Sequence, residues 1–433
     1  MATGEDDTPP AAAGHRVPRL RRASFLRSLG PGLITGAADD DPSGIATYSQ
    51  VGAQFGYSLG WTMLFSYPLM VVTQVISAEI GAVSGRGISQ NLRRHYPASI
   101  LRVAVLLLLV ANVINLGADL GAMGAALGLL MPGPDLVYTA AFGVLCALLE
   151  IFVSYSRYVV VLKWLTLSLF AYVAVVLAVH VPWGAALRGA LLPQLAFDND
   201  HAMALVAVLG TTISPYLFFW QAGEEVEELH RRHLKRMAAN PGAAKPELAR
   251  IRTDTLVGMG ISNLIALFII IATAATLNAS GVTQIDTSSQ AAEALRPVAG
   301  VFTFALFAAG IIGTGMLAVP VLAGSAAYAV SEMFRWPEGL DRRPREAKAF
   351  YATIAVTTLG GVALNFTGLD PIRALYWSAV VNGILAAPLM AIMIMIAMNP
   401  RIMGRLTLPP WMAVIGGLAT VVMAVASIAF LVL

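Results

Sequence analysis

Long apolar runs, separated by short polar segments, follow one another through almost the whole chain. Runs such as "LRVAVLLLLVANVINLGADLGAMGAALGLL" and "TLVGMGISNLIALFIIIATAATL" exceed the roughly 20 residues that a helix needs to cross a membrane. The pattern predicts an all-α polytopic membrane protein with eleven transmembrane helices. These helices are expected at residues 28–52, 57–83, 99–130, 135–153, 158–182, 201–228, 253–278, 297–332, 348–366, 371–398 and 409–432.

The charged residues support this count and orient the chain. Only 12% of residues are charged, against roughly 25% in a soluble domain. With the N-terminus inside, all 28 Lys and Arg residues fall on the cytoplasmic side except Arg188, Arg296 and Arg373. Because cytoplasmic loops carry the basic excess, we expect a multi-pass protein of the cell membrane with its C-terminus outside. The basic balance therefore reflects topology and does not indicate nucleic-acid binding.

Eleven helices divide into two groups of five and one more. We expect a disordered, basic cytoplasmic tail at 1–27 and a first five-helix repeat at 28–182. A second repeat should cover 183–398, with a cytoplasmic loop at about 229–252, and the eleventh helix lies in 399–433. Inverted repeats of this size are a recurring transporter plan, in which corresponding broken helices flank the substrate.

Two predicted helices are interrupted at equivalent positions of their halves. The first contains "AADDDPSGIATYSQ", where Pro42, Ser43 and Gly44 would break the helix. Five helices later the sixth contains "TTISPYLFFWQ", where Pro215 follows Ser214. One proline in a membrane helix is commonly a kink, but two matching breaks, one of them beside carboxylates, favour a substrate site.

Three consecutive carboxylates at membrane depth require a functional explanation. A carboxylate at the bilayer centre costs several kcal/mol, so it normally faces a cavity, a partner or an ion. Successive helical residues turn by about 100°, so Asp39, Asp40 and Asp41 cannot share one ion unless the helix unwinds. Unwound carbonyls, carboxylates and hydroxyls form the ligand set of a hard cation, and Asp41 touches the break.

Few other polar residues add chemistry at this depth. Asp119, the only acid in the third helix, lies on a small-residue face and fits structural pairing or an ion pathway equally well. No histidine is placed to relay protons. The sequence carries no HExxH, GxSxG, P-loop or dinucleotide-binding motif, and an aspartate protease would have to recruit Asp119 as its second acid. We therefore expect no enzyme and no cofactor.

These residues resemble the Nramp (natural-resistance-associated macrophage protein) divalent-metal transporters over nearly the whole chain after the tail. "GPGLITGAADDDPSGIAT" is similar to the family's first-helix signature, and "VSGRGISQNL" to its Thr-Gly-Arg-Asp-Leu segment. "ADLGAMG" resembles its Asp-Leu-Ala-Glu pattern, and "TTISPYLFFWQA" stands in the place of its Met-Pro-His-Asn helix. The resemblance implies a LeuT-like fold of two inverted five-helix repeats with broken helices 1 and 6.

The resemblance also implies a metal site. It places Asp41 on the ion-binding aspartate and Thr211 on a carbonyl donor, while Gly44 stands where an asparagine ligand is usual and Ser214 replaces a methionine. Tyr216 and Gln221 replace two histidines, Ala122 replaces a glutamate, and either Ala379 or Asn382 stands at a glutamine. The implied ligands are Asp41, Gly44, Thr211 and Ser214; residues that would contact the ion through water or line its path are Asp40, Tyr216, Gln221, Asp119 and Asn382.

The departures from the family pattern suggest which ion is carried. Without the methionine sulfur at Ser214 the site loses a filter for transition metals, and Gly44 should widen it for a partly hydrated ion such as Mg²⁺. The pattern resembles the Nramp-related magnesium transporters. We therefore expect a secondary transporter for uptake of Mg²⁺ and Mn²⁺ without obligatory proton coupling, since the coupling residues are replaced.

Three alternatives stay open: a proton-coupled Mn²⁺/Fe²⁺ symporter, a cationic organic-solute transporter, and a metal sensor on the same scaffold. The expected partners are the divalent metal ion and the lipid bilayer, and a monomer is the simplest assembly.

Overall fold

The computed structural model describes residues 30–153 and 167–432, apart from 197, 233, 235, 240, 341 and 369. All regular elements in these residues are helical, which confirms the predicted fold class. Within this part of the chain nine helical segments are long and apolar enough to cross a membrane, and Leu167–Ala178 is a shorter apolar helix. The predicted tail at 1–27 and much of the predicted fifth helix lie outside the described residues.

The first half of the chain contains α2 (Pro31–Asp39), α3 (Pro42–Phe55), α4 (Trp61–Ser84), α5 (Ile88–His95), α6 (Ala98–Gly128), α7 (Asp135–Phe152) and α9 (Phe170–Ala178). The second half contains α10 (Trp183–Leu191), α11 (Asn199–Thr212), α12 (Pro215–Arg231), α13 (Pro241–Thr276), α14 (Ser288–Glu293), α15 (Arg296–Ala299), α16 (Thr303–Phe334), α17 (Lys348–Leu364) and α18 (Pro371–Ala397). The chain continues through α19 (Pro400–Met403) and α20 (Pro410–Val432). Short 3₁₀ turns lie at Leu167–Leu169, Met237–Ala239, Asn278–Ser280, Gly300–Phe302 and Asn365–Thr367.

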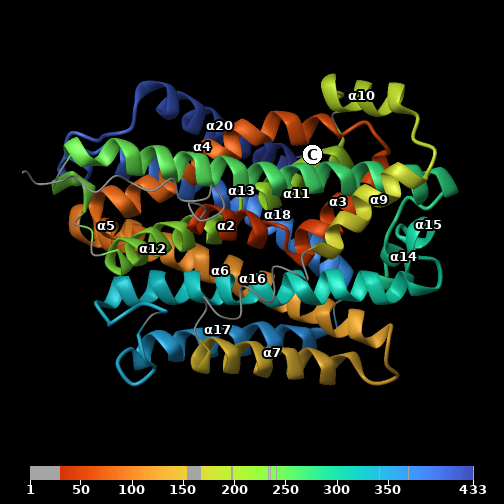
Figure 1. The fold of residues 1–433 in the computed structure, drawn as a ribbon, viewed down its shortest axis with the longest axis horizontal. Coiled ribbons are helices and arrows are strands. Elements are labelled where there is room, and N and C mark those ends of the chain that lie inside the picture. Colours follow the sequence, from red (N-terminus) through yellow and green to blue (C-terminus); the bar gives the residue numbers. More distant parts are fainter. Residues whose placement is uncertain are drawn as a thin grey trace, which may run out of the picture.

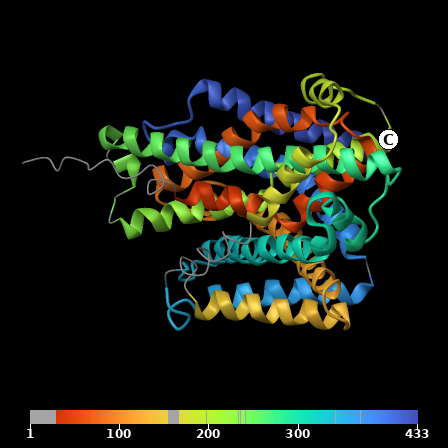
Figure 2. The ribbon, with the colours of Figure 1, turned by 45° about the vertical axis from the view of Figure 1, so that its right-hand side comes forward.

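The long helices run roughly side by side around a centre that is formed by the two interrupted helices (Figure 1). There α2 and α3 pack on α13, and α11 packs on α18, while α6 packs on α16. Helices α7 and α17 lie together along one side of the molecule in both views (Figure 2). Following the orientation predicted from the basic residues, we call the end with α5 and the C-terminus of α12 the inner end, and the end with α10, α14 and α15 the outer end (Figure 1).

Both predicted breaks are present. Helix α2 ends at Asp39 and α3 begins at Pro42, so Asp40 and Asp41 are the non-helical residues. Likewise α11 ends at Thr212 and α12 begins at Pro215. The unwound residues therefore precede the prolines, and Pro42, Ser43 and Gly44 form the first turn of α3. Proline lacks an amide hydrogen but tolerates the first helical turn, so it begins the second segment.

The seventh helix begins earlier than its apolar run. α13 starts at Pro241, not at 253, so much of the predicted 229–252 loop is helical. Hydropathy detects only the apolar part, whereas the polar turns before it are stabilised by side-chain pairs. Arg250, for example, bonds Glu247 one turn before it at 2.6 Å.

A carboxylate on α13 caps the start of α2 at the inner end. Asp254 accepts hydrogen bonds from the amides of Gly30 at 3.0 Å, Gly32 at 2.9 Å and Leu33 at 3.1 Å. The first amides of a helix have no partner within the helix, and its N-terminus carries partial positive charge. Asp254 therefore ties the first broken helix to the second half of the chain.

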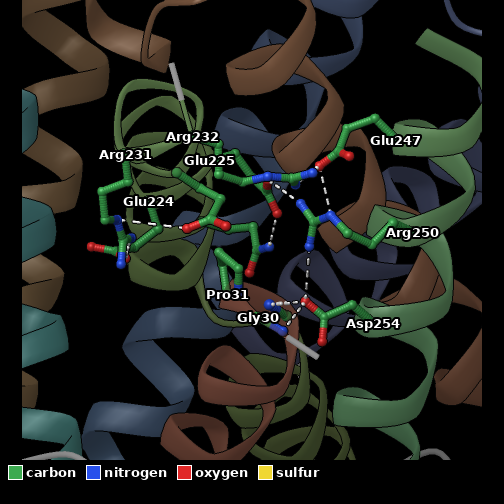
Figure 3. Close-up of polar contacts among 12 residues, drawn as sticks. Gly30, Pro31, Glu224, Glu225, Arg231, Arg232, Glu247, Arg250 and Asp254 are labelled. Carbon is green, nitrogen blue, oxygen red and sulfur yellow. Dashed lines mark hydrogen bonds and ion pairs between the residues drawn. The ribbon is translucent and has the colours of Figure 1, made fainter. Parts of the chain in front are cut away.

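Arg250 extends this contact to α12. Figure 3 shows its guanidinium group between Glu247 and Asp254. It bonds Glu225 at 3.1 Å and lies 3.7 Å from Asp254. Glu225 accepts a bond from Gln221 at 3.3 Å, and Gln221 in turn accepts one from Thr35 on α2. Helices α2, α12 and α13 are thus joined at the inner end by a polar network.

Glycines let α2 approach α13 closely. A β-carbon at Gly258 would lie 2.3 Å from the Gly32 oxygen, and one at Gly36 would lie 2.3 Å from the Gly258 backbone. Backbone atoms cannot rotate away as a side chain can, so this contact requires glycine on both helices.

We expect Gly258→Ala to lower the free energy of unfolding by about 2 kcal/mol, because the added methyl overpacks this contact. The matched control is Gly417→Ala on α20, where a β-carbon meets nothing within 4 Å. There the change should be neutral or stabilising, since alanine favours helix over glycine. Thermal unfolding of the purified variants in detergent measures both, and equal melting temperatures would contradict the packing argument.

We expect Asp254→Asn to speed hydrogen exchange of the Gly32 and Leu33 amides about tenfold or more. Hydrogen bonds to a charged acceptor contribute about 1.5–3 kcal/mol, and asparagine removes the charge and one acceptor oxygen. Hydrogen–deuterium exchange with mass spectrometry measures the effect. Asp286→Asn, which removes the exposed partner of Arg373 at the outer end, is the control and should leave these amides unchanged. Unaltered protection in Asp254→Asn would show that the cap does not hold α2.

Candidate functional site

The two helix breaks meet at the centre of the molecule. A β-carbon on Gly44 would lie 3.3 Å from Thr211 Oγ1, so the first turn of α3 lies against the end of α11. From the second break, the Tyr216 hydroxyl lies 3.0 Å from the carbonyl oxygen of Ala38 and 3.2 Å from Asp41 Oδ2, so its single hydrogen is shared between them. Side chains from both halves of the chain therefore surround the same non-helical residues.

Asp41 is the most connected carboxylate at this point, and 1% of its surface is exposed. One oxygen, Oδ1, caps α3 by accepting bonds from the Gly44 amide and the Ser43 hydroxyl, each at 2.7 Å. The other, Oδ2, accepts bonds from Asn115 at 3.1 Å and Tyr216 at 3.2 Å. Charge-assisted bonds of this kind stabilise a buried carboxylate. Asp41 thereby links α3, α6 and α12.

Asp39 and Asp40 share one donor. The Ser262 hydroxyl of α13 lies 2.7 Å from Asp39 Oδ2 and 3.0 Å from Asp40 Oδ1. A serine hydroxyl has a single hydrogen, so it satisfies only one of these contacts at a time. Asp39 Oδ1 is buried and has no hydrogen-bond partner among the described residues.

Helix α6 adds Asp119 and Asn115, one turn apart on the same face. Asp119 is fully buried, and neither of its oxygens has a hydrogen-bond partner in the described part of the chain. It lies within electrostatic range of Asp41. The Oδ1 atom of Asn115 is also buried without a partner there. Polar atoms of both residues thus remain available beside the break.

The second break presents backbone and hydroxyl oxygens. Ser214 Oγ lies 2.9 Å from the Thr211 carbonyl oxygen and 3.0 Å from the Gly210 carbonyl oxygen. These two oxygens share its single hydrogen. Thr211 Oγ1 is buried without a hydrogen-bond partner among the described residues. The carbonyl expected to act as a ligand is therefore held by Ser214 in this conformation.

The other predicted site residues do not all lie beside Asp41. Gln221 lies in the inner-end network, bonded to Thr35 and Glu225, and not at Asp41. Asn382 is buried on α18 with its amide nitrogen unpaired within the described residues. A β-carbon at Gly44 would already meet Thr211 and Tyr48 within 3.4 Å. Little free space therefore lies beside Gly44 in this conformation, and the expectation that glycine leaves more room here than asparagine stays a prediction.

The centre carries excess negative charge. Asp39, Asp40, Asp41 and Asp119 are all at least 96% buried. In the described part of the chain none of the four pairs with Lys, Arg or His, and the charged groups that act on them are other aspartates. Such an arrangement is costly unless a cation or protons compensate it. It suits binding of a positive ion.

Carboxylates alone do not complete such a site. Among the residues that the structure describes, no three His, Cys, Asp or Glu side chains converge closely enough to hold one metal ion. A metal at this centre would therefore need amide, hydroxyl or backbone oxygens as well. The side chains nearest to Asp41, namely Ser43, Asn115 and Tyr216, offer such oxygens.

A cavity of about 260 Å³ opens at the outer end, along the same helix that Asp41 caps. Its walls include Ala46, Gln50 and Gln54 of α3, together with Asp200 and Asp286. Amide and carboxylate oxygens therefore line this cavity beside α3, together with the guanidinium of Arg373, which pairs with Asp286 at 2.8 Å.

Sequence reasoning missed two contributors to the centre. Asn115 stands four residues before Asp119, and this helical spacing could have indicated that both face the break. Ser262 had no such signal, because it is a single serine in an apolar helix and its role depends on how α13 packs.

The chain was compared with known proteins. Residues 32–433 match the natural resistance-associated macrophage protein-like family, Nramp. The "Divalent metal cation transporter MntH" of Klebsiella pneumoniae (strain 342) is 28% identical over 411 residues, which cover 92% of each chain. A crystal structure of the Eremococcus coleocola manganese transporter, in complex with an aromatic bis-isothiourea substituted compound, is similar with a TM-score of 0.75. It is 17% identical, and the match covers 94% of this chain and 87% of that one.

A second solved structure, MhsT in complex with L-phenylalanine, has a TM-score of 0.57 at 14% identity, covering 95% of this chain and 98% of that chain. At these identities, the similarity to the two solved structures establishes the fold of this chain. That fold contains the two interrupted helices described above. The family match extends from α2 to the C-terminal helix and includes both breaks. The chain is thus an integral membrane protein that belongs to the Nramp family.

Proposed function

We propose that this protein is a secondary transporter that takes up a hard divalent metal cation across the cell membrane. Mg²⁺ is the proposed main substrate and Mn²⁺ is also accepted, without obligatory proton coupling. Family membership and the name of the Klebsiella relative support divalent-metal transport, and the proposed ion rests on the chemistry of the centre.

The observation that carries the proposal is the group of four buried aspartates between the two breaks, with no basic partner among the described residues. A buried anionic centre favours a cationic substrate and disfavours an anionic one. Carboxylate, hydroxyl, amide and carbonyl oxygens are hard donors, which suit Mg²⁺ and Mn²⁺.

We assign the ion to the space between the breaks. Asp41 would bind it directly or through its water, with the Thr211 carbonyl and Ser214 opposite. Asp40, Tyr216, Asp119 and Asn382 would contact its water or line its path, whereas Gln221 would act at the inner end. Binding would release the Thr211 carbonyl from the Ser214 hydroxyl, which lies 2.9 Å away.

Alternating access would then move the ion from the outer to the inner end. The outer cavity reaches Ala46 on α3, five residues after Asp41. At the inner end α2 is held by Asp254, and by Glu225 through Gln221. Release to the cytoplasm would require these inner contacts to separate while the outer cavity closes.

A second function, proton-coupled import of Mn²⁺ or Fe²⁺, is supported by two observations. Asp119 has a buried carboxylate without a hydrogen-bond partner in the described residues, which could carry a proton. Met123 places a thioether beside Gly315 and Pro42, and sulfur favours transition metals.

We expect Asp41→Asn to abolish Mg²⁺ and Mn²⁺ uptake into proteoliposomes. Asparagine caps a helix about as well as aspartate, so this change removes the charge while keeping an oxygen for the Gly44 amide. Glu293→Gln, which removes an exposed partner of Arg296 outside the cavity lining, is the control and should retain most activity. An Asp41→Asn protein that transports at the wild-type rate would refute the site assignment.

We expect Mn²⁺ uptake without acidification of the liposome interior. A pH-sensitive dye inside the proteoliposomes reports proton entry while a metal-sensitive dye reports Mn²⁺, and a protonophore should leave the initial Mn²⁺ rate unchanged. Proton influx that follows the addition of Mn²⁺ would instead establish the coupled importer.

A further inference from the structure

Asn115 is a buried asparagine whose amide nitrogen is hydrogen-bonded and whose amide oxygen is not, within the described residues. The residue lies on α6, is fully buried, and its Nδ2 atom donates to Asp41 Oδ2 at 3.1 Å. Its Oδ1 atom has no partner in the described part of the chain. Buried polar atoms are almost always hydrogen-bonded, so an unpaired carbonyl oxygen beside a carboxylate indicates a group that binds both.

The amide can serve Asp41 in two ways. When the carboxylate is free, the N–H group donates to it, as observed. When a cation binds the carboxylate, the positive charge competes with that donor, and the amide oxygen becomes the favourable contact. Asparagine can therefore stabilise the site both empty and occupied without gaining or losing a proton.

A hard cation needs neutral oxygens from outside α3. Gly44 offers no side chain, so on α3 the Ser43 hydroxyl, which donates to Asp41, is the side-chain oxygen beside this carboxylate. Mg²⁺ seeks six oxygen ligands in near-octahedral geometry, some of them water. Asn115 is the side-chain amide that the structure places in hydrogen-bond contact with Asp41.

We propose that Asn115 is a direct ligand of the transported cation, that its amide oxygen binds the ion beside Asp41, and that this oxygen favours hard ions. The inference rests on the proposed function, because it assigns a further ligand to that site.

The test is a change of ligand chemistry. Asn115→Cys replaces a hard oxygen by a soft sulfur, so the ratio of Cd²⁺ to Mg²⁺ uptake in proteoliposomes should rise about tenfold over wild type. The control is Asn112→Cys, which adds the same thiol on the same helix. Asn112 is equally buried and its Oδ1 is also unpaired among the described residues, but its Nδ2 bonds Leu322 and Ser325 of α16 and not Asp41, so its variant should keep the wild-type ratio.

A residue that only positioned Asp41 would lower the transport of every ion alike. An unchanged Cd²⁺ to Mg²⁺ ratio in Asn115→Cys, at any overall rate, would therefore overturn the inference. If that variant does not fold, isothermal titration of Asn115→Asp with Mg²⁺ decides the question. An added carboxylate at the ion should tighten binding severalfold, and unchanged affinity would refute ligation. If the wild-type protein neither binds nor moves Mg²⁺ or Mn²⁺, the proposed function itself fails.

Discussion

The geometry of the centre depends on one buried carboxylate. Asp41 accepts hydrogen bonds from the start of its own helix and from α6 and α12, through Gly44, Asn115 and Tyr216. These donors stabilise the charge, and in return the charge fixes where α3 begins. A cation that binds Asp41 has to share its oxygens with these groups. Ion binding at this residue would therefore act directly on the relative positions of three helices, as a transport cycle requires.

The inner end uses the same chemistry for a different purpose. Asp254 also caps a half-helix, but there the carboxylate and the capped helix come from opposite halves of the chain. Arg250 forms ion pairs with both Asp254 and Glu225 of α12. Opening this end therefore separates charged groups and exposes the first amides of α2, both of which water can compensate. A closure built from polar contacts is better suited to reversible opening than one built from close apolar packing.

Hydropathy predicted the fold well because the bilayer imposes one requirement on every helix. The positions of the long helices and the existence of both breaks followed from apolar runs and prolines. Where the structure differs from the prediction, a polar contact is the cause. The start of α13 at Pro241 depends on pairs such as Arg250 with Glu247, which an average over apolar residues does not detect. The first break lies directly before Pro42, which begins a helix that Asp41 caps.

The centre was less predictable than the fold, since it depends on which side chains meet across helices. Asp41 and Tyr216 could be proposed from their places beside the prolines, and the structure brings them together at 3.2 Å. The contact of Ser262 with Asp39 depends on the depth at which α13 packs, which glycines such as Gly258 determine. No local pattern encodes that depth.

The charge of the centre bears on proton coupling. One divalent cation compensates two of the four carboxylates, so the other two must be balanced by protons or by a second cation. Asp39 and Asp40 lie on one side of the break and share Ser262, whereas Asp119 approaches Asp41 from α6. Protons that remain on the Ser262 side through the cycle would balance charge without being transported. A proton that left with the ion would have to come from a group that interacts electrostatically with Asp41, such as Asp119. Buried acids are therefore compatible with both mechanisms, which differ in whether the proton stays in the protein or travels with the ion.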